Sequence, residues 1–214
     1  SKSRDCLMNN IIIIVPTLNE KENIQILFNK LTYTNIAFDL LFIDDNSNDG
    51  SQESIINLAK KNQNIYYIFR PKKMGIGSAH KEGLVWSYKK NYKIIITMDG
   101  DLQNDPSDIP GMLEYAITEE YDLVTGIRQK RKDSQVKKIP SKIANFLVRR
   151  VTKLDIKDNG CALKVFTKDI AKSLNLYGEM HRFITLLAYL EGAQIKQVPV
   201  KHHARHAGVS KYGL

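Results

Sequence analysis

The sequence has 214 residues, 43% of them hydrophobic and 26% charged, which fits one globular domain and excludes a disordered chain. No apolar run approaches the about 20 residues of a membrane-spanning helix, and the polar residues 1–10 do not resemble a signal peptide. With only Cys6 and Cys161, a disulfide framework is excluded and a reducing cytosol is the simplest setting. The net charge of +9 predicts a polyanionic partner.

Basic residues concentrate in residues 130–153 and near the C-terminus. Stacking aromatic residues are not interleaved with them, so anionic lipid or a phosphorylated substrate is favoured over nucleic acid. The periodicity of residues 140–154 predicts a basic amphipathic helix that could lie on an anionic bilayer. The alternative is a solvated face on an ordinary core helix.

Strand and helix patterns alternate in the first half of the chain. Ile11–Val15 is a continuous β-branched run, typical of a strand buried on both faces, and Pro16 ends it. Asn19 is predicted to cap the next helix, with Glu22 as its capping-box partner. The same cycle then repeats with strands at 40–43, 65–69 and 94–96, and helices after residues 50 and 77.

The second half is less regular, with strands predicted at 121–125 and 195–200 and helices at 140–154, 167–176 and 183–190. The alternation predicts an α/β fold with a mostly parallel central sheet and helices on both faces. We expect one domain from Met8, a natural start, to Leu214, with residues 1–7 outside it. Because no terminating element precedes Leu214, we expect the natural chain to continue, with room for a membrane anchor.

Two carboxylates separated by one glycine, Asp99 and Asp101, directly follow an apolar strand. In parallel sheets, ligands gather beyond the carboxyl ends of the strands. Mg²⁺ and Mn²⁺ favour a few protein oxygens, with water and substrate phosphates completing the shell. The pattern therefore predicts a divalent-metal site for a nucleotide diphosphate, with Gln103 as a further oxygen ligand. The alternative is an acidic turn.

Asp44 and Asp45 end a second strand, where a carboxylate can bind ribose hydroxyls or a base edge. The following Asn-Ser-Asn-Asp-Gly is rich in turn formers, so a structural turn is the alternative.

The loop with Gly75 and Gly77 is a poor dinucleotide fingerprint, because His80 stands in the third glycine position. Its backbone and Lys72 or Lys73 could instead approach a pyrophosphate. A flexible glycine loop is the alternative.

The tail carries His202, His203 and His206 without a partner cysteine or carboxylate, so zinc is disfavoured. Arg205 and Lys211, with Ser210 between them, are better suited to hold phosphate oxygens. A disordered basic end is the alternative.

Taken together, these residues resemble a known family, the inverting family-two glycosyltransferases with a GT-A fold. Within it, the sequence resembles the polyprenyl-phosphate glycosyltransferases of the dolichyl-phosphate mannosyltransferase type. The resemblance covers the chain from Ile11 onward and rests on six segments in the family's order: Pro16–Glu20, Asp44–Ser47, Asp99–Gln103, Gly126–Arg128, Asp158–Cys161 and Gly208–Tyr212. Leu18 departs from the pattern, because an aromatic residue often stands there.

The resemblance implies transfer of a sugar, with inversion, from a nucleotide diphosphate to a polyprenyl phosphate on the cytoplasmic face of a membrane. It implies a Mg²⁺ or Mn²⁺ cofactor bound by Asp99, Asp101 and Gln103. The implied catalytic residues are Asp101, Asp158, Arg128, Arg205 and Lys211. Those implied to line the nucleoside pocket are Pro16, Glu20 and Asp44 or Asp45. From the glycine loop and the basic tail described above, Lys73, Gly75 and Ser210 are added as residues expected to bind substrate. The homo-oligomeric state stays open.

The acceptor is expected to need little general-base help, because a phosphomonoester with a second pKa near ~6 is largely a dianion at neutral pH. If a base acts, Asp158 or Asp101 is the candidate.

One alternative is the same fold acting on a polysaccharide or other glycan acceptor, which the phosphate-binding tail disfavours. A nucleotidyltransferase is disfavoured because no lysine-bearing glycine loop follows the first strand. A non-catalytic nucleotide-sugar binder is disfavoured by the pair Asp99 and Asp101.

Overall fold

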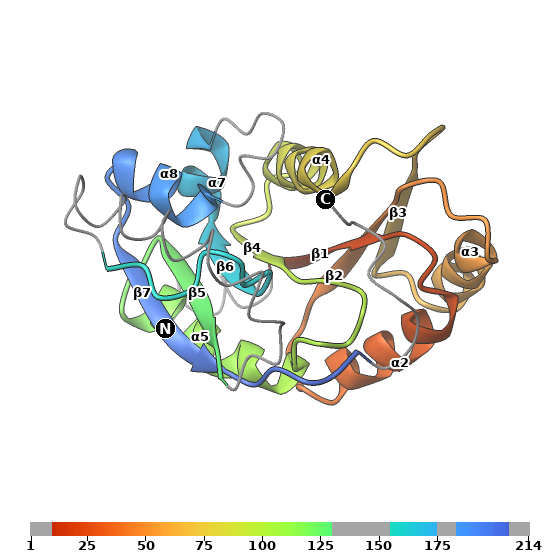
Figure 1. Ribbon diagram of the computed structural model, residues 1–214, viewed down its shortest axis with the longest axis horizontal. Coiled ribbons are helices and arrows are strands. Elements are labelled where there is room, and N and C mark those ends of the chain that lie inside the picture. The colour runs from red at the N-terminus through yellow and green to blue at the C-terminus, as the bar shows by residue number, and fades with distance from the viewer. Residues whose placement is uncertain (1–9, 130–154, 175–182, 206–214) are drawn as a thin grey trace, which may run out of the picture.

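The computed structural model describes residues 10–129, 155–174 and 183–205 (Figure 1). They form a seven-stranded sheet in the order β3-β2-β1-β4-β6-β5-β7. The strands are β1 Ile11–Thr17, β2 Asp39–Asp44, β3 Ile65–Phe69, β4 Ile94–Thr97, β5 Leu123–Arg128, β6 Lys164–Thr167 and β7 Ile195–Val200. The helices are α2 Lys21–Thr32, α3 Ser51–Lys61, α4 Ile76–Lys89, α5 Ile109–Thr118, α7 Lys168–Ser173 and α8 Ile184–Leu190, and a 3₁₀ turn η1 spans Pro106–Asp108.

The sheet is mostly parallel, as predicted. β1 pairs in parallel with β2 and β4, β2 with β3, and β5 with β7. Among the seven described strands, β6 alone runs antiparallel, between β4 and β5. The carboxyl ends of β1, β2, β4, β5 and β7 therefore meet at one edge of the sheet, together with the start of β6.

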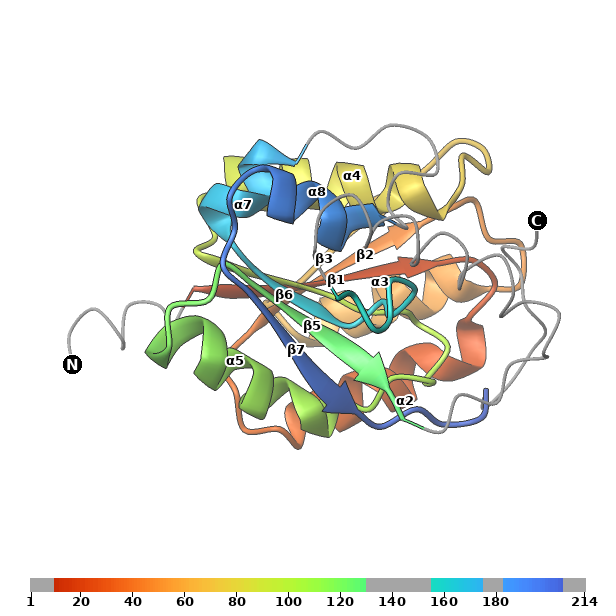
Figure 2. The same cartoon turned by 60° about the vertical axis from the view of Figure 1, so that its left-hand side comes forward.

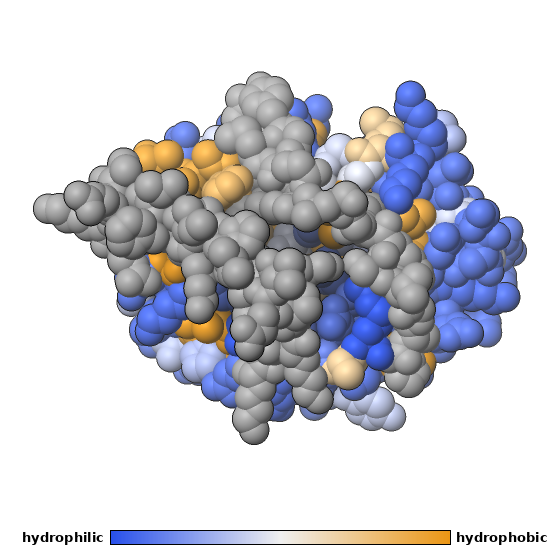
Figure 3. All heavy atoms as spheres, in the orientation of Figure 1, coloured by the Kyte–Doolittle hydropathy of each residue, from blue (hydrophilic) through white to orange (hydrophobic). Residues whose placement is uncertain are grey.

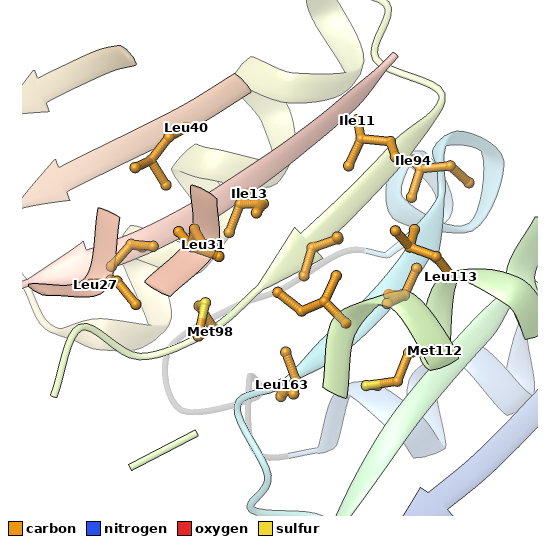
Figure 4. Packing of buried hydrophobic residues seen from close by; sticks show 14 of the residues in the cluster. Ile11, Ile13, Leu27, Leu31, Leu40, Ile94, Met98, Met112, Leu113 and Leu163 are labelled. Carbon is orange, nitrogen blue, oxygen red and sulfur yellow. The ribbon is translucent and has the colours of Figure 1, made fainter. Parts of the chain in front are cut away.

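Each face of the sheet is covered by its own set of helices (Figure 2). Because side chains alternate along a strand, Ile11 and Ile13 face one layer while Ile12 and Ile14 face the other. The first layer packs against Leu27 of α2 and Leu113 of α5 (Figure 4). The side chains of α3 belong to the same cluster. The second packs against α4, α7 and α8. Burial on both faces explains why β1 is an unbroken apolar run.

The structure corrects the prediction for the first helix boundary. Asn19 is not the cap of α2; Glu20 holds that position, and no side-chain capping bond is made there. Asn19 instead adopts a positive φ of 55° and accepts a hydrogen bond from the Asn48 backbone. Asn tolerates this conformation, so the residue serves as the turn between β1 and α2.

Two elements escaped the sequence reasoning, namely α5 and the antiparallel strand β6. The strand predicted at 121–125 is β5, which begins and ends later and includes Arg128. The basic segment 140–154, Ser210 and Lys211 lie outside the described residues. None of the helices in the described ranges has both the length and the apolar character of a bilayer span.

The surface differs between the two ends of the molecule. In Figure 3 the atoms over the α3 end are mostly hydrophilic, whereas hydrophobic atoms are visible over α7 and α8. Phe183 and Leu190, at either end of α8, are 37% and 65% exposed.

Candidate active site

The loop after β4 places Asp99 and Asp101 at the carboxyl edge of the sheet. Asp101 is 6% exposed; its Oδ1 accepts a hydrogen bond from the Gln103 backbone at 3.0 Å, and its Oδ2 lies 2.7 Å from Arg205 Nη2. Asp99 Oδ1 is buried and accepts no hydrogen bond from any described residue. Burial and the neighbouring Asp101 carboxylate raise the pKa of Asp99 to about 7. Leu102 holds a positive φ of 63°, so the loop turns sharply just after the two carboxylates.

This carboxylate pair fits a divalent metal. A buried oxygen without a partner, next to a second carboxylate, is a site where a cation relieves both desolvation and mutual repulsion. Within the described residues no group of three His, Cys, Asp or Glu side chains is placed to hold a metal. The protein would therefore supply Asp99 and Asp101, and phosphate and water oxygens would complete the shell, as Mg²⁺ commonly requires. The Gln103 Nε2 atom donates to the His203 carbonyl at 3.4 Å, and the predicted role of the Gln103 amide oxygen as a metal ligand stays a prediction.

Residues Lys201–Arg205, which we call the tail strap, run from the end of β7 along the segment that follows Asp101 (Figures 1 and 2). The Lys201 backbone donates to Asp108 Oδ2 at 2.8 Å. The His203 backbone donates to the Gln103 carbonyl at 2.8 Å, and the His203 ring lies 2.8 Å from Asp105 Oδ2. These bonds position Arg205 next to Asp101, although the two residues are far apart in the sequence.

Glu20 also lies beside Arg205, as a result of the turn between β1 and α2. Its backbone donates to Ser51 Oγ at 2.9 Å, and its Oε2 accepts from Asn23 Nδ2 at 2.6 Å. Its Oε1 lies 3.7 Å from Arg205 Nη1. Glu20 is 8% exposed, so its carboxylate is largely shielded from water. Arg205 thus sits between two carboxylates, Glu20 and Asp101.

Arg128 and Asp158, both predicted near the phosphates and sugar, are paired with each other. Arg128 Nε and Nη2 donate to the two carboxylate oxygens of Asp158 at 2.8 and 2.9 Å. Burial raises the pKa of Asp158, but the hydrogen bonds and charge of Arg128 outweigh it and leave the pKa below 3.8. A carboxylate with a lowered pKa is a weaker base, and the general-base role of Asp158 stays a prediction.

Asp44 and Asp45 are fully buried, and their oxygens bind protein groups. Asp44 accepts from Thr17, Ser47 and Gln52. Asp45 accepts from the Arg70 guanidinium and from the backbone N–H groups of Met74 and Gly75. The Gly75 N–H predicted to approach a pyrophosphate is therefore used to fix its own loop to Asp45.

The remaining predicted residues of this region lie in two settings. Pro16 is buried inside β1, in register with Ile43, rather than in the loop beyond the strand. Lys73 is exposed in the loop before Gly75. Their substrate-binding roles stay predictions.

Sequence reasoning missed two buried cations behind the site. Arg70 is 4% exposed and bonds Asp45, Glu82 and Ser78. Lys164, 3% exposed at the start of β6, donates to the Cys161 carbonyl, and burial lowers its pKa. A signal for Lys164 was present, because it interrupts the apolar run from Leu163 to Phe166. No pattern marked Arg70, whose partners come from distant segments.

Comparison with known proteins places these observations in a family. The family model for glycosyl transferase family 2 matches residues 12–174. Dodecaprenyl-phosphate galacturonate synthase of Rhizobium johnstonii is 35% identical over 213 residues, covering 94% of this chain and 61% of that protein. Undecaprenyl-phosphate 4-deoxy-4-formamido-L-arabinose transferase of Pectobacterium atrosepticum is 30% identical, covering 97% of this chain and 64% of that protein. The chain thus spans about three fifths of the length of these curated relatives.

A solved structure has the same fold. Glucosyl-3-phosphoglycerate synthase from Mycobacterium tuberculosis, in complex with Mn²⁺, UDP-glucose and phosphoglyceric acid, has a TM-score of 0.73 at 16% identity, covering 96% of this chain and 76% of that chain. The predicted GT-A fold and the resemblance to family-two enzymes are thereby confirmed. The chain belongs to glycosyl transferase family 2.

Proposed function

We propose that this protein transfers a sugar from a nucleotide diphosphate to a polyprenyl phosphate, with inversion and with a divalent metal. The observation that carries the proposal is the buried pair Asp99 and Asp101 with Arg205 beside it, at the edge where parallel strands end. The pair suits a metal and a diphosphate, and the arginine suits a phosphate. The names of the relatives, a dodecaprenyl-phosphate synthase and an undecaprenyl-phosphate transferase, support a lipid phosphate as acceptor.

The proposed reaction is a single displacement in which an acceptor phosphate oxygen attacks the anomeric carbon. An acceptor that is already a dianion needs positioning more than deprotonation. Both candidate bases support this view, since Asp158 is held by Arg128 and Asp101 by Arg205. Among the described residues, Arg205 is placed to hold the acceptor phosphate against the electrostatic repulsion from the donor diphosphate. When bound, the metal would stabilise the charge on the leaving nucleoside diphosphate.

We further propose that the protein works at the cytoplasmic surface of a membrane, because a polyprenyl chain is held in the bilayer and its charged phosphate stays at the surface. The net charge of +9 favours attraction to anionic lipids. The exposed Phe183 and Leu190 provide apolar surface at the α8 end. A vesicle sedimentation assay with anionic and neutral lipids over a salt series tests this location. Absence of binding at every salt concentration would argue against it.

The central test is isothermal titration with GDP and with UDP, each in Mn²⁺ and again in EDTA, followed by transfer assays. In these assays, undecaprenyl phosphate in detergent is offered a panel of nucleotide sugars, and the lipid product is identified by mass spectrometry. We expect metal-dependent binding of one nucleotide class and a sugar-phosphate lipid. Asp101→Asn should abolish both. Glu114→Gln, which removes one charge from an exposed position of α5, is the matched control. Transfer to a glycan acceptor, with none to the lipid, would overturn the proposed acceptor.

A further inference from the structure

Arg205 is shared between two carboxylates in an unequal way. Its Nη2 lies 2.7 Å from Asp101 Oδ2, a close ion pair, whereas its Nη1 lies 3.7 Å from Glu20 Oε1. The Arg205 side chain is 24% exposed and each carboxylate side chain 8%. The contact with Glu20 is therefore the looser of the two, and both carboxylates are largely shielded from water.

The position of Arg205 does not depend on this ion pair alone. The tail strap is hydrogen-bonded along residues 103–108 through Lys201 and His203. If Arg205 leaves Asp101, the strap keeps the guanidinium within reach of the site. Glu20 is likewise fixed by its bonds to Ser51 and Asn23. The Glu20 carboxylate thus has a fixed position on the other side of the guanidinium.

A metal ion would compete with Arg205 for Asp101. A divalent metal would take a carboxylate oxygen as a ligand, and the Asp101 Oδ2 atom is already bonded to the guanidinium. The other oxygen, Oδ1, accepts from the Gln103 backbone. Two cations on one carboxylate repel each other in a partly buried site.

We propose that Glu20 is a positioning residue that receives Arg205 when a metal-loaded donor takes Asp101. Arg205 then stays at the site on Glu20, with its charge directed to the acceptor phosphate. This inference rests on the proposed function for its last step and assigns Glu20 a role other than nucleoside binding. It implies an order of binding, in which the donor with its metal precedes the acceptor.

The first arm of the test measures Mn²⁺ binding alone by isothermal titration. Arg205→Ala should tighten Mn²⁺ binding by about fivefold, because the metal no longer has to break the partly exposed ion pair between Arg205 and Asp101. Lys201→Ala is the matched control, since it removes the same charge from the same strap but contacts Ser107 rather than Asp101. We expect less than a twofold change there. Weaker or unchanged Mn²⁺ binding in Arg205→Ala would contradict the proposed competition between Arg205 and the metal for Asp101.

The second arm is a double-mutant cycle between Glu20 and Arg205. Glu20→Gln should weaken Mn²⁺ binding, because Arg205 displaced from Asp101 then finds no second carboxylate. The weakening should vanish in the Arg205→Ala background. If it persists there, Glu20 acts on the metal directly and the proposed transfer of Arg205 is wrong. Glu20→Asp, which keeps the charge but withdraws it from Arg205, should weaken binding in the same direction.

The two arms separate this inference from the proposed function. They require neither a donor sugar nor a lipid, so a chain that fails to make a lipid product still gives an answer on Mn²⁺. Thermal unfolding of each variant without metal shows that the fold is intact. Where transfer is measured, Glu20→Gln should raise the KM for the lipid acceptor, and any rise in the KM for the metal-loaded donor should vanish in the Arg205→Ala background. A donor KM that stays raised in that background, with an unchanged acceptor KM, would mean that Glu20 binds the nucleoside and would overturn the inference.

Discussion

Asp158 accepts three hydrogen bonds from one residue, Arg128: from Nε at 2.8 Å, from Nη2 at 2.9 Å and from the backbone N–H at 3.1 Å. The pair ties the end of β5 to the segment before β6. Both side chains are largely buried, at 12% and 7% exposure. Removing one charge therefore leaves the other desolvated without compensation.

Asp158→Asn should lower the free energy of unfolding by about 3 kcal/mol at pH 7. The pKa of Asp158 in the folded protein lies below the 3.8 of the free side chain. A lowered pKa stabilises the fold above that value, and this contribution is lost as the pH falls through the folded pKa. The difference between wild type and variant should therefore shrink below about pH 4. Urea unfolding of both proteins at a series of pH values measures it.

The exposed Glu119 offers a control for that series, because Glu119→Gln removes one charge from a surface position. Its effect should stay within about 0.5 kcal/mol at every pH. An Asp158→Asn variant that is equally insensitive would mean that the ion pair with Arg128 adds nothing to stability.

Gly160→Ala should separate activity from stability. A Cβ at Gly160 would lie 2.9 Å from Arg128 Nη2, which is the far end of a flexible side chain. The Nη2 atom must shift from Asp158 Oδ1, while Nε can keep its bond to Oδ2. We therefore expect a cost of about 1 kcal/mol in the free energy of unfolding, well below the cost of breaking the whole ion pair. The shifted Arg128 should nonetheless lower kcat for sugar transfer. Urea unfolding and transfer kinetics test the two halves, and unchanged kcat would show that the position of Arg128 does not matter to transfer.

The parallel part of the sheet could be predicted from sequence because its strands are buried on both faces. Ile11–Val15 and Ile94–Ile96 carry that signal without help from other segments. The antiparallel strand β6 could not, because it has four residues and includes the charged Lys164. Helix α5 begins with Ile109 and Pro110 directly after the 3₁₀ turn η1, whose last residue, Asp108, accepts a hydrogen bond from the Lys201 backbone.

The candidate site was predictable where the chemistry is local and not where it depends on tertiary partners. Asp99 and Asp101 are separated by one glycine directly after an apolar strand, and this local pattern predicted a metal site. Asp45 was predicted as a ribose ligand; in the structure it accepts hydrogen bonds from Arg70, Met74 and Gly75, and its ribose role stays a prediction. The proximity of Arg205 to Glu20 joins opposite ends of the chain, and no sequence pattern reports such a contact.

Asp45→Asn and Glu82→Gln each remove one carboxylate from Arg70 and should differ strongly in effect. The Asp45 side chain is completely buried, whereas that of Glu82 is 42% exposed. Asp45→Asn should cost about 3 kcal/mol in the free energy of unfolding, and Glu82→Gln less than about 1 kcal/mol. Hydrogen exchange at Met74 and Gly75 should also become faster in Asp45→Asn, because Asp45 accepts from both N–H groups. Equal costs for the two variants would contradict the burial argument.

Gly83 and Gly111 provide a matched pair of helical glycines. A Cβ at Gly83 in α4 would lie 2.5 Å from Ile14 Cγ2 and 2.8 Å from Ile43 Cδ1, in the centre of the sheet, whereas one at Gly111 in α5 meets nothing within 4 Å. Gly83→Ala should therefore destabilise the protein by about 1–3 kcal/mol through overpacking. Gly111→Ala should stabilise it by about 0.5–1 kcal/mol, because alanine loses less backbone entropy in a helix. Chemical denaturation measures both, and since the substitution is the same, opposite signs can come only from the packing of α4 on the sheet.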